Sequence, residues 1–249
     1  MSRLSVRGLT KHYGGIAALS GAGFEIDAPG IYGLIGPNGA GKTTLFDILS
    51  GSVPPDRGQV LLDGRDVTGF AAHRMARLGM ARTFQECRIL PEETCLENVL
   101  FAAQQKGMRA TLVQLASRSQ AARRAKQDEA MRLLALVRLE AYAHAPAEAL
   151  SFGQRRLLEI VSTFIGAPDV LLLDEPASGV NPALLVTLSE FIRTMYAERP
   201  RVFMVVEHNM EFIMSLAGDI IVMHQGAVLE RGTPEAVQAS RLVIEAYLG

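Results

Sequence analysis

The sequence contains few cysteines and no excess of charge of either sign. Its only two cysteines, Cys87 and Cys95, fit no zinc-binding or redox spacing, which excludes cysteine-based sites of those kinds and favours a reduced, cytoplasmic protein. The chain carries 25 basic and 26 acidic residues among 249, a net charge of −1. It therefore lacks, as a whole, the positive potential that recognition of nucleic acid or anionic lipid requires, and we expect no nucleic-acid partner.

Long hydrophobic runs are also absent. No stretch approaches the roughly 20 apolar residues that span a bilayer. The first residues, 1–7, alternate polar and apolar side chains like a strand and lack the apolar centre of a signal peptide. We therefore expect a protein that is soluble by itself and that reaches a membrane only through a partner.

Strand patterns occupy both ends of the chain. Residues 3–9 and 22–27 alternate as half-buried strands, with a turn at Gly14-Gly15 between them. Short apolar or alternating runs predict further strands at 31–35, 59–62, 170–173, 202–206, 220–224 and 227–230. The runs at 170–173 and 202–206 are continuously apolar, which is typical of buried parallel strands, and Gln225-Gly226 predicts a closing hairpin.

The middle of the chain has a different character. Between about residues 86 and 167 strand patterns vanish, and Gln120–Leu139 shows apolar residues at helical spacing. Strands that alternate with helices predict an α/β fold with a mostly parallel sheet, into which a helical lobe is inserted.

A glycine-rich phosphate loop follows the predicted strand at 31–35. Its residues are Gly36, Pro37, Asn38, Gly39, Ala40, Gly41, Lys42, Thr43 and Thr44. Gly36 and Gly41 permit backbone angles that let successive N–H groups point at an anion, and the helix predicted over 43–49 adds positive charge at its N-terminus. Lys42 would reach the β- and γ-phosphates and the Thr43 hydroxyl would bind Mg²⁺.

An acidic pair ends the strand at 170–173. A carboxylate at the carboxyl end of a parallel strand lies where open α/β sheets bind ligands. Asp174 would hold Mg²⁺ through water, and Glu175 would polarise the attacking water. By itself such a pair is often only a helix cap or turn, but together with the phosphate loop it predicts nucleotide hydrolysis.

These motifs, taken in order, resemble those of the ABC-type ATPases over essentially the whole chain. The set comprises the phosphate loop at 36–44, Gln85, Leu150–Gln154, Leu171–Pro176, Ser178–Asn181 and His208. The resemblance implies a P-loop NTPase core with a mostly parallel sheet, an N-terminal antiparallel β subdomain and an inserted α-helical subdomain. We expect a single domain over 1–249, with residues 1–85 and 168–249 in the core with its β subdomain and 86–167 in the helical subdomain with the signature motif.

The resemblance also assigns roles to single residues. It implies that Tyr13 stacks on adenine, that Gln85 senses Mg²⁺ and the attacking water, and that His208 is a switch residue near the γ-phosphate. Ser151, Gly153 and Gln154 belong to the signature motif, which contacts ATP bound by a second copy of the domain. Ser178–Asn181 matches the loop between the two sites, although Asn181 replaces the usual aspartate and Phe152 replaces the usual glycine of the signature.

Several segments resemble, more narrowly, the ATP-binding subunit of branched-chain amino acid importers. They are residues 79–85, which include Ala-Arg-Thr-Phe-Gln, and residues 151–159, 206–210 and 243–249. This resemblance implies a peripheral subunit at the cytoplasmic face of a bacterial inner or plasma membrane. Its partners would be two membrane permease subunits that dock near Cys87–Thr94, a second ATPase subunit, identical or paralogous, and indirectly a periplasmic binding protein.

Other interpretations remain at this point. ATPases of importers for urea, short amides or other amino acids share these features. A soluble ABC ATPase of translation or DNA repair would have two fused domains or long coiled coils, a small-molecule kinase would not need Ser151–Gln154, and a purely regulatory module would not need Glu175 and His208.

Overall fold

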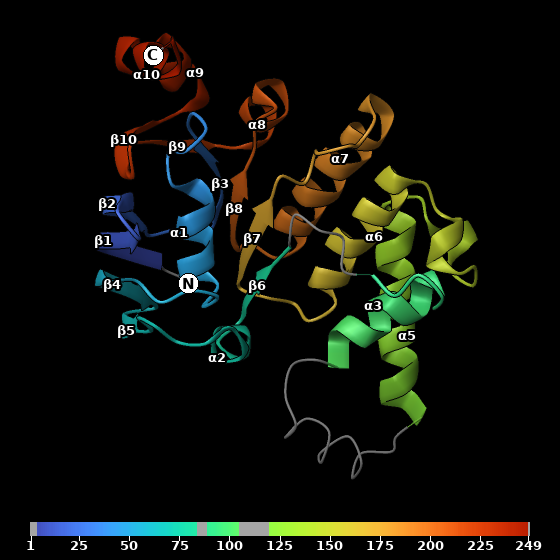
Figure 1. Ribbon diagram of the computed structural model, residues 1–249. Helices are drawn as coiled ribbons and strands as arrows, with labels where there is room; N and C mark the ends of the chain where they lie inside the picture. The colour runs from blue at the N-terminus through green and yellow to red at the C-terminus, as the bar shows by residue number, and fades with distance from the viewer. Residues whose placement is uncertain (1–3, 84–88, 105–119, 249) are drawn as a thin grey trace. The chain divides into compact units, whose positions relative to one another are not determined.

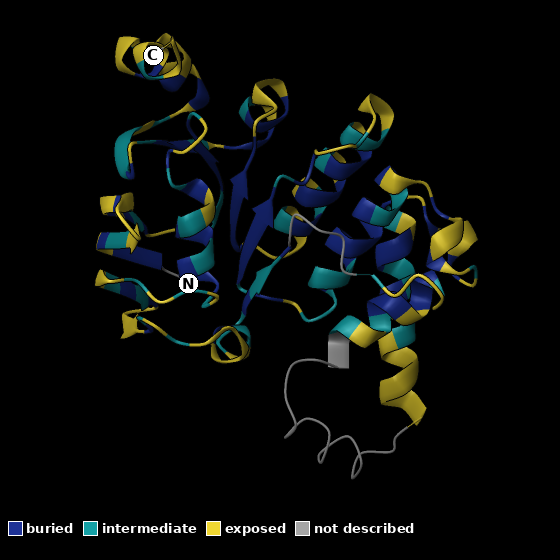
Figure 2. Ribbon diagram, viewed as in Figure 1, coloured by how far each residue is buried: buried dark blue, intermediate teal, exposed yellow. Residues whose placement is uncertain are grey.

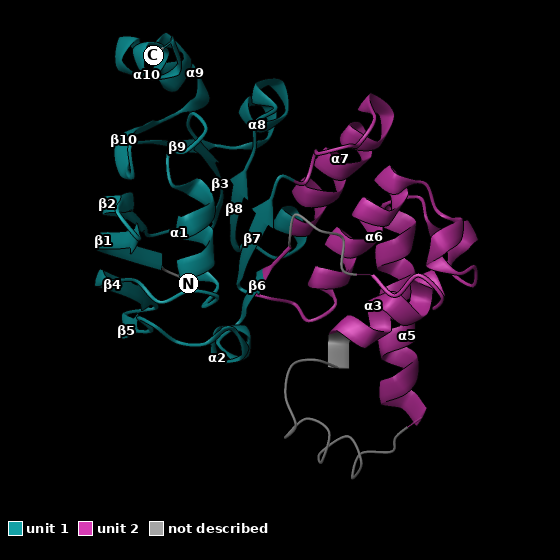
Figure 3. Cartoon of the chain, in the orientation of Figure 1, with its two compact units in different colours: residues 1–81, 169–175, 196–249 teal, residues 82–168, 176–195 magenta. Residues whose placement is uncertain are grey.

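The computed structural model describes residues 4–83, 89–104 and 120–248. The chain divides into two compact units (Figure 3), which are described separately. Unit 1 comprises residues 1–81, 169–175 and 196–249, and unit 2 comprises residues 82–168 and 176–195. Residues 176–195 thus group with the helical segment, whereas the sequence assigns them to the core. The subdomain boundaries stay a prediction, because compactness alone does not test which segments act together.

An antiparallel sheet lies at the N-terminal end of unit 1 (Figure 1). Its strands are β1 (Leu4–Tyr13), β2 (Ile16–Ile26), β4 (Arg57–Leu62) and β5 (Arg65–Asp66), in the order β2-β1-β4-β5. The predicted strands at 3–9, 22–27 and 59–62 correspond to β1, β2 and β4, with residue 3 outside the described residues and β2 ending at residue 26. β1 runs beyond residue 9 because β2 continues to pair with it up to Tyr13, opposite Ile16.

The larger sheet has six strands in the order β10-β9-β3-β8-β7-β6. They are β3 (Gly30–Ile35), β6 (Met80–Arg82), β7 (Val170–Asp174), β8 (Val202–Val206), β9 (Asp219–His224) and β10 (Ala227–Gly232). The central strands β9, β3, β8 and β7 are parallel, as the apolar runs predicted, and β10 returns antiparallel through Gln225-Gly226. Strand β6 was not predicted, because three residues are too few to display an alternating pattern.

Helix α1 (Lys42–Leu49) joins both sheets of unit 1 in one core. Its Leu45, Phe46 and Leu49 are fully buried among apolar side chains from β1, β2, β3, β7, β8 and β9. In Figure 2 the central strands are accordingly the most uniformly buried part of this unit. The remaining helices of unit 1 are α2 (Ala72–Arg77), α8 (Met210–Leu216), α9 (Pro234–Ala239) and α10 (Arg241–Leu248).

Unit 2 is helical in its described part, as the sequence predicts for this region. It contains α3 (Cys95–Gln104), α5 (Gln120–Leu136), α6 (Phe152–Phe164) and most of α7 (Pro182–Glu198), with short 3-10 turns at Glu140–Tyr142 and Ala147–Ala149. Phe164 of α6 meets Phe191 of α7 edge to face, with ring centroids 4.8 Å apart. α5 ends three residues before the predicted Leu139, close to Arg138, whose φ of 59° leaves the helical region.

No helix among residues 4–83, 89–104 and 120–248 is long and apolar enough to cross a membrane.

Candidate functional site

The phosphate loop joins β3 to α1, and its backbone excludes side chains at two glycines. A Cβ on Gly36, whose φ is 150°, would lie 2.1 Å from the Met223 carbonyl oxygen. A Cβ on Gly41, whose φ is 97°, would lie 2.4 Å from the Ala18 carbonyl oxygen. The turn between β9 and β10 braces the loop, because Gly226 donates its N–H to the Ala40 carbonyl at 3.1 Å. Neighbouring strands therefore fix the path of the loop.

Lys42, the first residue of α1, supplies the positive charge of the loop. Its Nζ donates to the carbonyl oxygens of Gly36 at 2.7 Å and Pro37 at 3.0 Å, so the ammonium is held against the loop backbone. Burial lowers the Lys42 pKa from its usual value, and the negative charge of Glu175 partly offsets that shift. An ammonium group at a helix N-terminus beside a glycine-rich turn fits a phosphate chain.

The other loop residues surround this charge. Thr43 and Asn38 are exposed and Thr44 is half-buried, while the Ala40 N–H closes the turn on the Pro37 carbonyl at 3.2 Å. The exposed Thr43 hydroxyl, in the first turn of α1, is open to a ligand.

Glu175 and His208 meet at the carboxyl ends of adjacent strands. Asp174 is the buried last residue of β7, and Glu175 follows it with a φ of 45° while donating its N–H to the Val206 carbonyl of β8 at 2.9 Å. His208 comes two residues after β8, and its Nε2 lies 2.8 Å from Glu175 Oε1. Neighbouring parallel strands end at the same edge of the sheet. The topology therefore brings together Glu175, predicted to polarise the attacking water, and His208, the predicted switch residue.

The segment around His208 is ordered by a carboxylate that was not predicted from the sequence. Glu207 is buried, and its Oε2 accepts the N–H groups of His208 at 3.0 Å and Asn209 at 3.3 Å. Asn209 in turn caps α8 by accepting the Phe212 N–H at 3.0 Å. The only sequence signal was an acidic residue between a buried strand and a helix cap.

Tyr13, the predicted adenine-stacking residue, ends β1 beside the turn at Gly14. Its side chain is 47% exposed, and Lys11 Nζ lies 5.7 Å from the ring centroid. The ring therefore stands in solvent with a cation beside it, which leaves aromatic surface available for a base.

A second tyrosine reaches the phosphate loop from the C-terminal helix. The Gly36 backbone N–H hydrogen-bonds to the phenol oxygen of Tyr247 in α10; burial raises the Tyr247 pKa and this hydrogen bond partly opposes the shift. The tail 243–249 entered the sequence-based prediction only as a resemblance, because a contact spanning more than 200 residues leaves no local pattern.

The signature residues begin α6 in unit 2. Ser151 is the N-cap: its Oγ accepts the Gln154 N–H at 3.4 Å, and Gln154 Oε1 accepts the Ser151 N–H at 3.0 Å. Gly153 is buried, and a Cβ there would lie 2.9 Å from the Leu184 side chain. The signature is therefore a rigid helix start, whose exposed Ser151 is free to face another molecule.

Phe152 and Asn181, the two departures from the family pattern, both have structural partners. The Phe152 ring lies so close to Gly179 that a Cβ on that glycine would be 2.4 Å from Cε1. It therefore packs on the backbone of the loop Ser178–Asn181. Asn181 Oδ1 accepts the Leu184 N–H at 3.0 Å at the start of α7, a capping role that aspartate would also perform.

Gln85, Cys87 and Arg88 lie outside the described residues. The rest of the predicted docking segment is ordered by the buried Asn98 of α3. Its Oδ1 accepts the Leu90 N–H at 2.7 Å, and its Nδ2 donates to the carbonyls of Leu90 at 2.9 Å and Thr94 at 3.0 Å.

In the part of the chain that the structure describes, no group of three or more His, Cys, Asp and Glu side chains is placed to hold a metal ion. Thr43 and Asp174 carry side-chain oxygens of the kind that Mg²⁺ prefers, but two such side chains are too few for a cage made by protein alone. This donor set fits an ion that is shared with phosphate oxygens.

This chain is similar to known proteins over most or all of its length. A family model described as ABC transporter matches residues 19–178. The high-affinity branched-chain amino acid transport ATP-binding protein BraF of Pseudomonas aeruginosa is 38% identical over 254 residues, covering 100% of this chain and 99% of that protein. Its counterpart LivG of Escherichia coli K12 is 37% identical over 249 residues, covering 99% and 97%.

A solved structure, a nucleotide-free ATP-binding cassette from an ABC transporter, is similar over 100% of both chains, with 26% identity and a TM-score of 0.86. The predicted fold class is thereby confirmed. The chain belongs to the ABC transporter family and is an ABC ATPase, as its motifs predicted.

Proposed function

We propose that this ABC ATPase is the ATP-hydrolysing subunit of an importer for branched-chain amino acids. The observation that carries the enzymatic part is the Glu175–His208 pair, 2.8 Å apart, whose carboxylate also acts electrostatically on Lys42 of the phosphate loop. A base, its histidine partner and a phosphate-binding cation thus share one site in unit 1. The amino acid cargo is inferred from the functions of BraF and LivG, which match along nearly their whole length.

Each residue then has a defined task in hydrolysis. The loop Gly36–Thr44 binds the phosphates through its backbone N–H groups and Lys42, and Tyr13 stacks on the adenine. Glu175 takes a proton from the attacking water, and His208 holds that carboxylate in position. Mg²⁺, held by Thr43, Asp174 and Gln85, would neutralise phosphate charge.

The site is completed by a second ATPase subunit. Ser151, Gly153 and Gln154 contact the nucleotide bound by that partner, so two chains enclose two ATP molecules. Because ATP binds the closed pair more tightly than the open pair, its binding and hydrolysis drive the membrane subunits. Those subunits dock near Cys87–Thr94 and keep the protein at the cytoplasmic face of the membrane, while a periplasmic binding protein delivers the cargo.

The Glu175→Gln variant tests the enzymatic part. Replacing the general base by an isosteric amide is expected to lower ATP turnover by about 10²- to 10⁴-fold. Affinity for ATP, measured by equilibrium dialysis, should be retained. Lys42→Ala is the matched variant that should lose binding as well as turnover. A Glu175→Gln enzyme with unchanged turnover would contradict the assignment of the base.

Purification from membranes tests the transport part. The full chain, isolated with its membrane partners and reconstituted in vesicles, should support ATP-dependent uptake of leucine that Glu175→Gln abolishes. Recovery with ribosomes or DNA instead of permease subunits would overturn the transporter assignment, and uptake of urea or short amides but not leucine would correct the cargo.

A further inference from the structure

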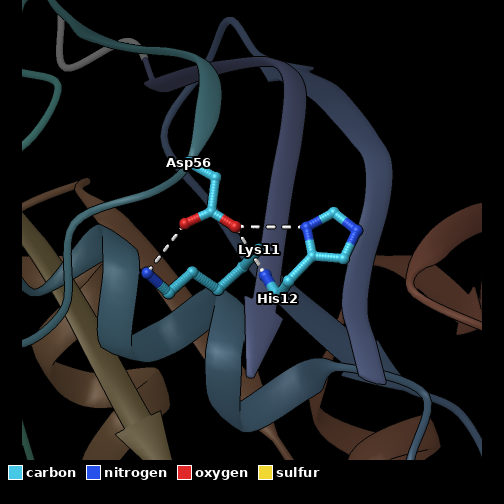
Figure 4. Close-up of polar contacts among 3 residues, drawn as sticks. All are labelled: Lys11, His12 and Asp56. Carbon is cyan, nitrogen blue, oxygen red and sulfur yellow. Dashed lines mark hydrogen bonds and ion pairs between the residues drawn. The ribbon is translucent and has the colours of Figure 1, made fainter. Parts of the chain in front are cut away.

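The exposed end of β1 is held by an aspartate from a distant loop. Asp56 precedes β4, and its Oδ2 accepts the backbone N–H of His12 at 2.7 Å, while its Oδ1 accepts from Lys11 Nζ at 3.0 Å (Figure 4). The Asp56 N–H donates to the Thr10 carbonyl at 2.9 Å, and His12 Nδ1 lies 3.2 Å from Oδ2. One residue therefore binds three consecutive positions of β1.

This arrangement replaces a strand partner that β1 has lost. The register between β1 and β4 ends with Thr10 opposite Arg57, three residues before β1 itself ends. Along those last residues only β2 continues the ladder. The Asp56 carboxylate accepts the His12 N–H that would otherwise face solvent on the β4 side.

The residue presented at this end is Tyr13. It follows His12 directly, and the ammonium of Lys11 lies 5.7 Å from its ring centroid. The Lys11 side chain is only 14% exposed, so Asp56 holds a cation of restricted freedom beside the aromatic ring. Asp56 thus controls both the backbone before Tyr13 and the charged group next to its ring.

Global stability is a poor explanation for such contacts. Exposed ion pairs contribute little to unfolding free energy, because solvent screens them and two side chains must be ordered. A carboxylate that accepts several hydrogen bonds at an exposed strand end has its main effect on local geometry. At this end of β1, the geometry that it fixes is that of an exposed aromatic side chain.

We propose that Asp56 is a positioning residue for recognition of the nucleotide base, acting through Lys11 and His12 on the orientation of Tyr13. This inference rests on the proposed role of Tyr13 in stacking on adenine. Its ligand is the planar base of the nucleotide, and the phosphate chain is bound elsewhere, by the loop at Lys42.

Asp56→Asn is the informative change, since the amide is isosteric but has an NH₂ group in place of one of the two oxygens that accept from Lys11 and His12. Losing base stacking altogether costs on the order of five- to a hundredfold in affinity, which sets the limit for Tyr13→Ala. Asp56→Asn is expected to weaken ATP binding by about three- to tenfold. Binding of inorganic tripolyphosphate, which has no base, should be unchanged in both variants.

A double-mutant cycle and a matched control complete the experiment. In the Tyr13→Ala background, Asp56→Asn should have no further effect on ATP affinity, because the two residues act in series. The control is Asp66→Asn in the same sheet, an exposed aspartate that accepts from Thr68 N–H and from Gln59 Nε2 and should leave ATP affinity unchanged.

The outcomes separate the two proposals. Equal losses of ATP and tripolyphosphate, additive effects in the double variant, or unchanged ATP affinity in Asp56→Asn or Tyr13→Ala would each overturn the role of Asp56. If the wild-type chain bound neither ligand, or if Lys42→Ala bound both as well as wild type, the proposed function itself would fail. Circular dichroism of each variant checks that the fold is retained.

Discussion

At the scale of single residues, Gly36 shows how tightly the phosphate loop is built. An alanine there would place Cβ 2.1 Å from the backbone oxygen of Met223, and it would adopt a φ that costs other residues about 1–3 kcal/mol even without a clash. We expect Gly36→Ala to abolish nucleotide binding and to lower the melting temperature. Gly15→Ala is the control, because its Cβ would meet nothing within 4 Å. Equal melting temperatures and ATP affinities for the two variants would mean that the loop tolerates a side chain at residue 36.

Asp56 gives a prediction about pH. Hydrogen bonds from Lys11 and His12 lower its pKa from 3.8 to about 2. Because the folded-state pKa is the lower one, the stabilising contribution is fully present above about pH 4 and is lost as the pH falls towards 2. The melting temperature of wild type should therefore exceed that of Asp56→Asn by a small amount at pH 5, because an exposed ion pair contributes little to the unfolding free energy. The difference should shrink between pH 4 and 2, and a difference that persisted at pH 2 would show that the Asp56 charge is not its source.

The sequence could reveal some of these residues but not others. The phosphate loop is contiguous, and its glycine spacing reflects local backbone needs, so Gly36–Lys42 could be predicted. Asp56 and Tyr247 act through contacts that join distant parts of the chain. Such contacts produce no repeating pattern in the sequence from which they could be predicted. Only the fold brings such residues to the site.

At the scale of elements, Asn98 determines the shape of the predicted docking segment. Its buried amide holds both backbone groups of Leu90 and the Thr94 carbonyl. Asn98→Ala leaves buried polar groups unsatisfied, which costs about 1–3 kcal/mol of unfolding free energy, measurable by urea denaturation. The exposed Glu92 in the same segment provides the control Glu92→Gln, for which we expect almost no change. Comparable losses in both variants would mean that Asn98 has no special role.

Prediction of elements succeeded where a pattern was long enough. The apolar runs at 170–173 and 202–206 identified β7 and β8 because strands buried on both faces need continuous hydrophobicity. The sequence did not predict β6, which has three residues, or the last part of β1. Their extended conformation is imposed by neighbouring strands and by Asp56 rather than by their own side chains.

At the scale of the whole molecule, the proposed function predicts an ATP-dependent dimer. Glu175→Gln should retain ATP and so keep two chains together, doubling the mass measured by light scattering when ATP and Mg²⁺ are added. The double variant Lys42→Ala/Glu175→Gln, which should bind no ATP, is expected to keep its original mass. If the native pair consists of two different chains, the same measurement should be made on an equimolar mixture of this chain and its paralogous ATPase subunit.

The parallel order of the larger sheet has a consequence for how the chain is made. β3 leads directly into the phosphate loop, yet its hydrogen-bonded neighbours are β8 and β9, which begin at residues 202 and 219. During synthesis the ribosome therefore releases the nucleotide-binding loop long before the strands that hold it in place. The loop therefore gains its supporting strands only after residues 202–224 have been synthesised.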